Sequence, residues 1–182
     1  MRRRVVSWLT VVTLLAFLSS ACLPPVPTPG RAGQVKRVLI LGDSVTFGLF
    51  GTSPQVQTPL RAMLADRGVD LHVQGFPAEN PLFVWPGHFG WSLRMQHEVS
   101  TWDPDMVIVQ SMLFPDSDDA ARRTAYSNAI VEIFDIARSR GAHVYTVSHH
   151  VPPGTEWSRG REVAESLQAE AAASRQIQRI PL

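Results

Sequence analysis

Two patterns of apolar and polar residues alternate along the chain from Val35 onward. Short runs rich in apolar and branched residues predict β-strands. They are residues 36–42, 69–76, 104–113 and 142–150, and residues 177–182 begin a fifth run. Segments with helical periodicity separate the runs. They are residues 54–68, 89–102, 117–141 and 160–175.

The predicted helices carry apolar faces and end signals. The face of the first consists of Val56, Leu60, Met63 and Leu64. The face of the longest, residues 117–141, consists of Ala125, Ala129, Ile130, Ile133, Phe134 and Ala137. Gly68 and Gly141 are expected to end these two helices, and Asp118 is expected to cap the start of the longest.

Regular alternation of strand and helix predicts an α/β fold, a three-layer arrangement with a parallel sheet and helices on both of its faces. Crossovers in such sheets are right-handed, and ligands bind beyond the carboxyl ends of the strands. That edge is expected to collect Ser44, the loop 75–90, the loop 111–119, and His149 with His150.

The first 34 residues are expected to lie outside the folded domain, which spans residues 35–182. Three arginines precede an apolar stretch, residues 5–18, of the length of a signal-peptide core. Residues 1–22 are therefore predicted to be a signal peptide. Residues 23–34 are rich in proline and predict an extended linker.

Cys22 is the single cysteine of the chain and follows the small residues "SSA", so no internal disulfide can form. A lone cysteine at a cleavage site resembles the lipobox of bacterial lipoproteins, which implies lipidation of Cys22. The alternative is ordinary secretion with cleavage near Ala21. We expect the lipid-anchored form, at the outer face of the cytoplasmic membrane.

Composition narrows the function classes. The chain has 182 residues, 45% of them hydrophobic, and a net charge of +1. This length suits one domain with a full core, and the weak charge does not favour a nucleic-acid partner.

The segment "VLILGDSVTFGLFG", residues 38–51, places Ser44 just after a buried strand. There its hydroxyl would lie beside free N–H groups at the start of a helix, as in an acyl-transfer site. Asp43 and Ser44 are also favoured helix caps and turn residues. The local pattern alone leaves both interpretations open.

The same segment resembles the first motif of the GDSL/SGNH hydrolases, with Gly42, Asp43, Ser44 and Gly48 in register. The resemblance implies the flavodoxin-like fold of that family and assigns Ser44 as the nucleophile. By element order it covers most of residues 35–182. This first block is its one specific sequence match.

The family's second and third motifs have weaker counterparts. The resemblance implies an oxyanion N–H donor after the second strand, at Gly75 or Ala78. It also implies an asparagine donor after the third strand, where the chain has Leu113 within Ser111 to Phe114. Loss of such a donor costs about 10²–10³ in rate. Asn80 is a possible substitute, although a turn residue is the simpler interpretation.

The family's fourth motif, Asp-x-x-His after the fifth strand, does not occur after Gly160. The chain is therefore expected to lack the C-terminal part of the fold and with it the usual base. His149 or His150, at the end of the fourth strand, is the fallback base. The alternative is a loop pair that leads into Pro152.

Other candidates carry less weight. Phe83, Trp85, Phe89 and Trp91 in the second loop can line an acyl or sugar pocket, but covering the core is the simpler interpretation. His72, His88, His97 and His143 are scattered. The adjacent His149 and His150 lack further ligands at metal spacing, so we expect no metal and no cofactor.

The sequence predicts an exported serine hydrolase that cleaves an ester-bearing small molecule, a lipid or an acylated glycan. The missing asparagine and the missing Asp-x-x-His favour an alternative, an inactive envelope module that binds a glycan or a partner protein. A flavodoxin-like cofactor binder lacks a phosphate-cradling loop after the first strand.

Overall fold

The computed structural model describes residues 34–46, 54–111, 118–148 and 158–181. The strands in this part of the chain are β1 (Arg37–Gly42), β2 (Asp70–Gly75), β3 (Met106–Gln110), β4 (His143–Ser148) and β5 (Gln178–Pro181). The helices are α2 (Ser44–Thr46), α3 (Pro54–Ala65), α4 (Trp91–Thr101), α5 (Ala120–Arg138) and α6 (Ser158–Ser174). All five predicted strands and all four predicted helices are confirmed.

The strands form one parallel sheet in the order β2-β1-β3-β4-β5. Strand β1 lies between β2 and β3, with Gly42 opposite Gly75 on one side and opposite Gln110 on the other. Every residue of β1 after Arg37 is buried, as the apolar run predicted. The carboxyl ends of β1, β2 and β3 therefore meet at one edge, called here the carboxyl edge.

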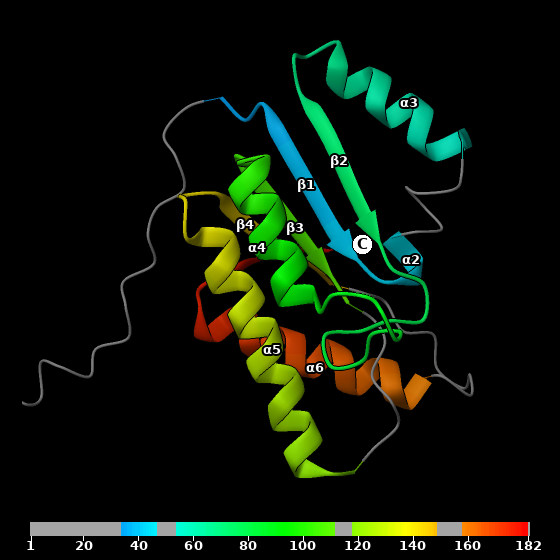
Figure 1. Cartoon of the computed structure of the whole chain (residues 1–182), viewed down its shortest axis with the longest axis vertical. Helices are drawn as coiled ribbons and strands as arrows, with labels where there is room; N and C mark the ends of the chain where they lie inside the picture. The colour runs from blue at the N-terminus through cyan, green and yellow to red at the C-terminus, as the bar shows by residue number, and fades with distance from the viewer. Residues whose placement is uncertain (1–33, 47–53, 112–117, 149–157, 182) are drawn as a thin grey trace, which may run out of the picture.

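Helices cover both faces of the sheet, which confirms the predicted α/β architecture (Figure 1). The larger core packs α4, α5 and α6 against Leu39, Leu41 and other side chains on one face. Helix α3 packs on the opposite face, where Val38 and Ile40 are buried. Figure 1 shows α4 and α5 side by side in front of the strands, and α3 beside β2.

Three details of the predicted helices need correction. Asp119, not Asp118, caps α5, because its carboxylate accepts the N–H groups of the first turn, whereas Asp118 pairs with Arg123 and Arg159. On α5, Tyr126 is fully buried whereas Ala125 is exposed. On α3, Met63 is 55% exposed, because the side of α3 that meets the sheet carries Leu60 and Leu64.

Both glycines expected to end helices have the required backbone. Gly68 follows α3 with φ 70°, and Gly141 follows α5 with φ 84°. In this left-handed region a side chain is strained, so glycine is the default residue. The N–H of Gly141 donates to the carbonyl of Arg138, which closes the last turn.

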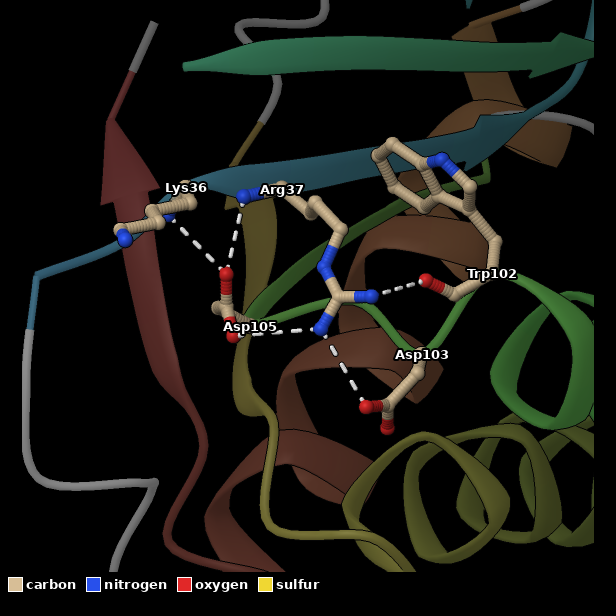
Figure 2. A network of polar contacts seen from close by, with 5 residues as sticks. All are labelled: Lys36, Arg37, Trp102, Asp103 and Asp105. Atoms are coloured by element: carbon tan, nitrogen blue, oxygen red, sulfur yellow. Dashed lines mark hydrogen bonds and ion pairs between the residues drawn. The ribbon is translucent and has the colours of Figure 1, made fainter. Parts of the chain in front are cut away.

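A charged cluster joins the amino ends of β1 and β3 (Figure 2). One carboxylate oxygen of Asp105 accepts the N–H groups of Lys36 and Arg37, at 3.0 and 2.9 Å. The Arg37 guanidinium donates to the Trp102 carbonyl at 2.8 Å and pairs with Asp103 at 3.2 Å. The cluster lies at the end of the sheet opposite to the carboxyl edge and ties the start of β1 to the loop before β3.

Candidate functional site at the carboxyl edge

The first motif forms a tight turn at the end of β1. Asp43 is completely buried, and its carboxylate accepts the N–H of Val45 at 2.9 Å. The short helix α2 begins at Ser44, which is half-buried. Asp43 therefore performs the capping role that the sequence had left open between the two residues. The Ser44 hydroxyl is not needed for that role.

A buried contact holds α2 against β3. The Thr46 hydroxyl donates to Oε1 of Gln110 at 2.5 Å, and both side chains are buried. A Cβ atom added to Gly42 would lie 2.6 Å from the same Oε1 and 2.8 Å from the Gln110 carbonyl oxygen. Glycine is therefore required in the motif because the third strand and α2 leave no room for a side chain.

A buried polar network lies beneath the motif. The hydroxyls of Ser111 and Tyr126 hydrogen-bond to each other at 2.6 Å. The Ser111 N–H donates to Oε1 of Gln168, whose Nε2 donates to the Val147 carbonyl. Burial raises the pKa of Tyr126, the hydrogen bond from Ser111 opposes this, and the charge of Asp43 adds to it. The side chain of Ser111 thus points into the core and belongs to the support of the site.

The end of β2 and the loop after it contain the two alternative positions of the expected oxyanion donor, Gly75 and Ala78. Gly75 is the last residue of β2 and pairs with Gly42, and the Phe76 N–H donates to the Gly42 carbonyl at 2.9 Å. Ala78 lies beyond the strand, is exposed and has φ 58°. A non-glycine residue in this region is uncommon and is held there by its surroundings.

Asn80 has a local structural role. Its side-chain oxygen accepts the N–H groups of Leu82 and Phe83, at 2.8 and 2.9 Å, while its own N–H donates to the Phe83 carbonyl. This is the turn role that the sequence favoured.

The same loop encloses a buried carboxylate that sequence reasoning missed. The Glu79 side chain is 1% exposed. Its carboxylate accepts Nδ1 of His88, Nη1 of Arg94 at 2.8 Å and the Trp85 N–H at 3.3 Å. Burial raises the pKa of Glu79, but the hydrogen bonds from His88, Trp85 and Arg94 outweigh it, so the pKa lies below the usual value. Glu79 and His88 lie in an irregular loop and Arg94 lies on α4, so no periodic sequence pattern indicates that the three side chains meet.

The expectation that the loop aromatics cover the core is right for only one of them. Trp91 is buried in the core at the start of α4. Phe83, Trp85 and Phe89 are 47%, 48% and 68% exposed. The reason is geometric: Trp91 continues the inward stripe of α4, whereas the other three precede the helix.

Several predicted residues lie outside the described part of the chain. They are Cys22, Gly48, Met112, Leu113, Phe114, His149 and His150. The structure therefore brings together Asp43, Ser44 and the start of the loop after β2, and leaves the proposed bases as predictions. Within the described ranges, no cluster of three metal-binding side chains occurs, and no helix is long and apolar enough to cross a membrane.

Three solved structures that resemble this chain are described as a lipase and two esterases. A GDSL-like lipase from Bacteroides thetaiotaomicron has a TM-score of 0.58 at 16% identity, covering 93% of this chain and 76% of the lipase chain. The esterase EstA from Pseudoalteromonas has a TM-score of 0.57 at 15% identity, covering 81% of this chain and 77% of the EstA chain. AlinE4, an SGNH-hydrolase family esterase, has a TM-score of 0.53 at 15% identity, covering 82% of this chain and 77% of the AlinE4 chain.

No protein-family model matches the chain, and no curated protein does. The likeness is therefore carried by the order and packing of strands and helices rather than by sequence identity. It agrees with the resemblance seen in the Gly42-Asp43-Ser44 block, which lies at the end of β1. The chain has the three-layer α/β fold of the GDSL/SGNH hydrolases.

Proposed function

We propose that the protein is an ester hydrolase in which Ser44 is the nucleophile. The observation that carries this proposal is the division of roles at the end of β1: Asp43 caps α2, and Ser44 begins it at the carboxyl edge. The esterases and lipases that share the fold support the same reaction class. The substrate is an ester-bearing small molecule, lipid or acylated glycan.

The proposed reaction begins with attack of the Ser44 oxygen on the ester carbonyl carbon. The N–H groups of Ser44 and of Gly75 or Ala78 stabilise the oxyanion of the tetrahedral intermediate. A base takes the serine proton and delivers it to the leaving alkoxide, and water then releases the acyl group from Ser44. Within this chain we propose His149 or His150 as the base, because both directly follow the end of β4 in the sequence and the carboxyl ends of parallel strands meet at one edge.

Turnover of p-nitrophenyl acetate by the full chain tests the proposal. Ser44→Ala is expected to reduce turnover by several orders of magnitude, as is replacement of the histidine that acts as base. Ser166→Ala is the matched control, because Ser166 lies on α6 and its hydroxyl contacts Glu170. Equal rates for the wild type and Ser44→Ala would eliminate Ser44 as the nucleophile.

That negative result would favour the second candidate, a non-catalytic envelope module. The observation in its favour is that Leu113 stands where the resemblance implies the asparagine donor of the oxyanion site. Such a module keeps the fold and binds a glycan or a partner protein.

We further propose that the protein is exported and anchored through lipid on Cys22, with residues 23–34 as the linker. In a bacterial host, Cys22→Ala is expected to move the protein from the membrane fraction to the soluble fraction. Metabolic labelling with a fatty acid gives a separate readout. Unchanged fractionation together with no labelled wild-type protein would refute lipidation.

A further inference from the structure

A groove of about 960 Å³ lies between the edge strand β2 and helix α4. Its lining consists of Gln74, Phe76, His88, Phe89, Leu93, Arg94, Gln96, His97, Glu98 and Ser100. A volume of this size suits a small ligand. Neither Ser44 nor Gly75 nor Ala78 lines the groove, so it is a different surface from the proposed nucleophile site.

The groove exists because the apolar core stops before β2. On the face covered by α4, β1 contributes the buried Leu39 and Leu41. Their partners in the sheet register are His72 and Gln74 of β2, which are polar and half-buried. The edge of the sheet is therefore polar and concave where α4 passes over it.

One end of the groove is ordered by a hydrogen-bonded cluster around Glu98. Nε2 of Gln74 donates to Oε1 of Glu98 at 3.1 Å. Nε2 of His72 lies 3.2 Å from the other oxygen of Glu98. The Glu98 carboxylate is thus already in contact with two side chains, and a cationic ligand would have to displace them.

The other end is ordered by Glu79. This carboxylate binds Arg94 and Nδ1 of His88, and the Arg94 guanidinium lies 3.6 Å from the centroid of the Phe76 ring. Arg94 is therefore committed to a carboxylate and an aromatic face, which disfavours an anionic ligand. With Nδ1 turned to Glu79, the other ring nitrogen of the half-exposed His88 can serve a ligand.

Apolar side chains form the remaining wall. Phe89 is 68% exposed and Leu93 is 51% exposed, and both line the groove. A plain acyl chain would satisfy these two residues but would leave the imidazole and amide groups of the groove without water. A sugar ring presents an apolar C–H face and a rim of hydroxyls, so it matches both kinds of lining.

We propose that this groove binds a neutral sugar ring, with Phe89 and Leu93 against its C–H face and with Oε1 of Gln74 and Nε2 of His88 on its hydroxyls. Combined with the proposed function, on which this step rests, the ester cleaved by the protein is carried by a carbohydrate. The sugar occupies the groove, and we place its acyl group at the carboxyl edge, because Phe76 lines the groove and directly follows Gly75 at the end of β2.

Binding of cellotriose, xylotriose and tri-N-acetylchitotriose to the full-length Ser44→Ala protein tests the groove without any need for catalysis. Isothermal titration calorimetry is expected to detect at least one of them. Phe89→Ala is expected to weaken that binding about tenfold or more, equivalent to at least about 1.4 kcal/mol. Met63→Ala, a change at another exposed apolar side chain, on α3, is expected to leave the binding unchanged.

Several outcomes overturn the proposal. They are no binding of any of the three sugars, equal binding by the Phe89→Ala and Met63→Ala proteins, and displacement of bound sugar by decanoate, which would identify an acyl site. Failure of the hydrolase proposal has a different signature, namely equal p-nitrophenyl acetate turnover with and without Ser44. A protein that binds sugar but does not hydrolyse the ester would support the sugar-binding groove and contradict the hydrolase proposal.

Discussion

The Thr46 hydroxyl lies 2.5 Å from Oε1 of Gln110 and joins the turn that carries Ser44 to the third strand. Both side chains are buried, and Nε2 of Gln110 has no hydrogen-bond partner among the described residues. The contact therefore satisfies only one side of the Gln110 amide. It is a direct side-chain link between α2 and β3, and it makes the position of α2 depend on β3.

Removal of this link is expected to destabilise the fold. Thr46→Val leaves Oε1 of Gln110 buried without a donor, which costs about 1–3 kcal/mol. Urea unfolding measures the change. Thr124→Val is the matched control, because the Thr124 hydroxyl bonds the Ala120 carbonyl on the exposed side of α5, and its effect should stay within about 0.5 kcal/mol. Equal effects of both changes would contradict the role assigned to Thr46.

Gly42→Ala is expected to be more harmful than the same change elsewhere. The new methyl group would overlap Thr46 and Gln110, and overpacking of this kind costs about 1–3 kcal/mol. At Gly90, φ is −60° and no atom lies within 4 Å of an added Cβ, so Gly90→Ala should change stability by less than about 1 kcal/mol. Thermal unfolding of both variants makes the comparison, and a smaller loss at Gly42 would refute it.

Stability is expected to fall in acid through Glu79. Its pKa is lower in the folded protein than in the unfolded chain, so its contribution is present above the ordinary carboxyl pKa. That contribution is lost as pH falls through the folded value and Glu79 takes up a proton. Glu79→Gln should cost about 1–3 kcal/mol at pH 7 and show a weaker loss of stability between pH 5 and pH 3.

Urea unfolding across this pH range measures both effects. His88 and Arg94 are the two side chains that face the Glu79 carboxylate, and both are retained in Glu79→Gln. Glu162→Gln, at an exposed position on α6, supplies the control. An acid dependence that Glu79→Gln leaves unchanged would exclude Glu79 as its source.

The opposite pH dependence is expected from Tyr126. Burial raises its pKa, the Ser111 hydrogen bond opposes the shift and Asp43 adds to it. The contribution of Tyr126 to stability is therefore fully present below the ordinary tyrosine pKa, and it falls as pH rises above about 10. Tyr126→Phe should remove most of this alkaline loss, as followed by unfolding at pH 8 and pH 10.5. Tyr145, the other tyrosine, is half-buried and provides the control, and Tyr145→Phe should retain the loss.

The sequence already contained the order of strands and helices, because apolar runs and helical periodicity are local patterns. The stop signals at Gly68 and Gly141 are local for the same reason. The position of Ser44 at the carboxyl edge followed from topology, since every strand-to-helix loop of a parallel sheet meets there. The choice between Asp43 and Ser44 as the cap did not follow, because both side chains suit that role.

Only the tertiary structure decided which polar groups meet. Gln110 reaches Thr46 across 64 positions, and Glu98 reaches Gln74 across 24, so neither pair leaves a trace in any short window of sequence. Glu79 and His88 lie in an irregular loop without periodicity, and only its folding brings them together. The sequence thus determined the elements and the edge at which they converge. Packing determined the contacts at that edge and the groove beside it, because hydrogen bonds and burial depend on distance in space.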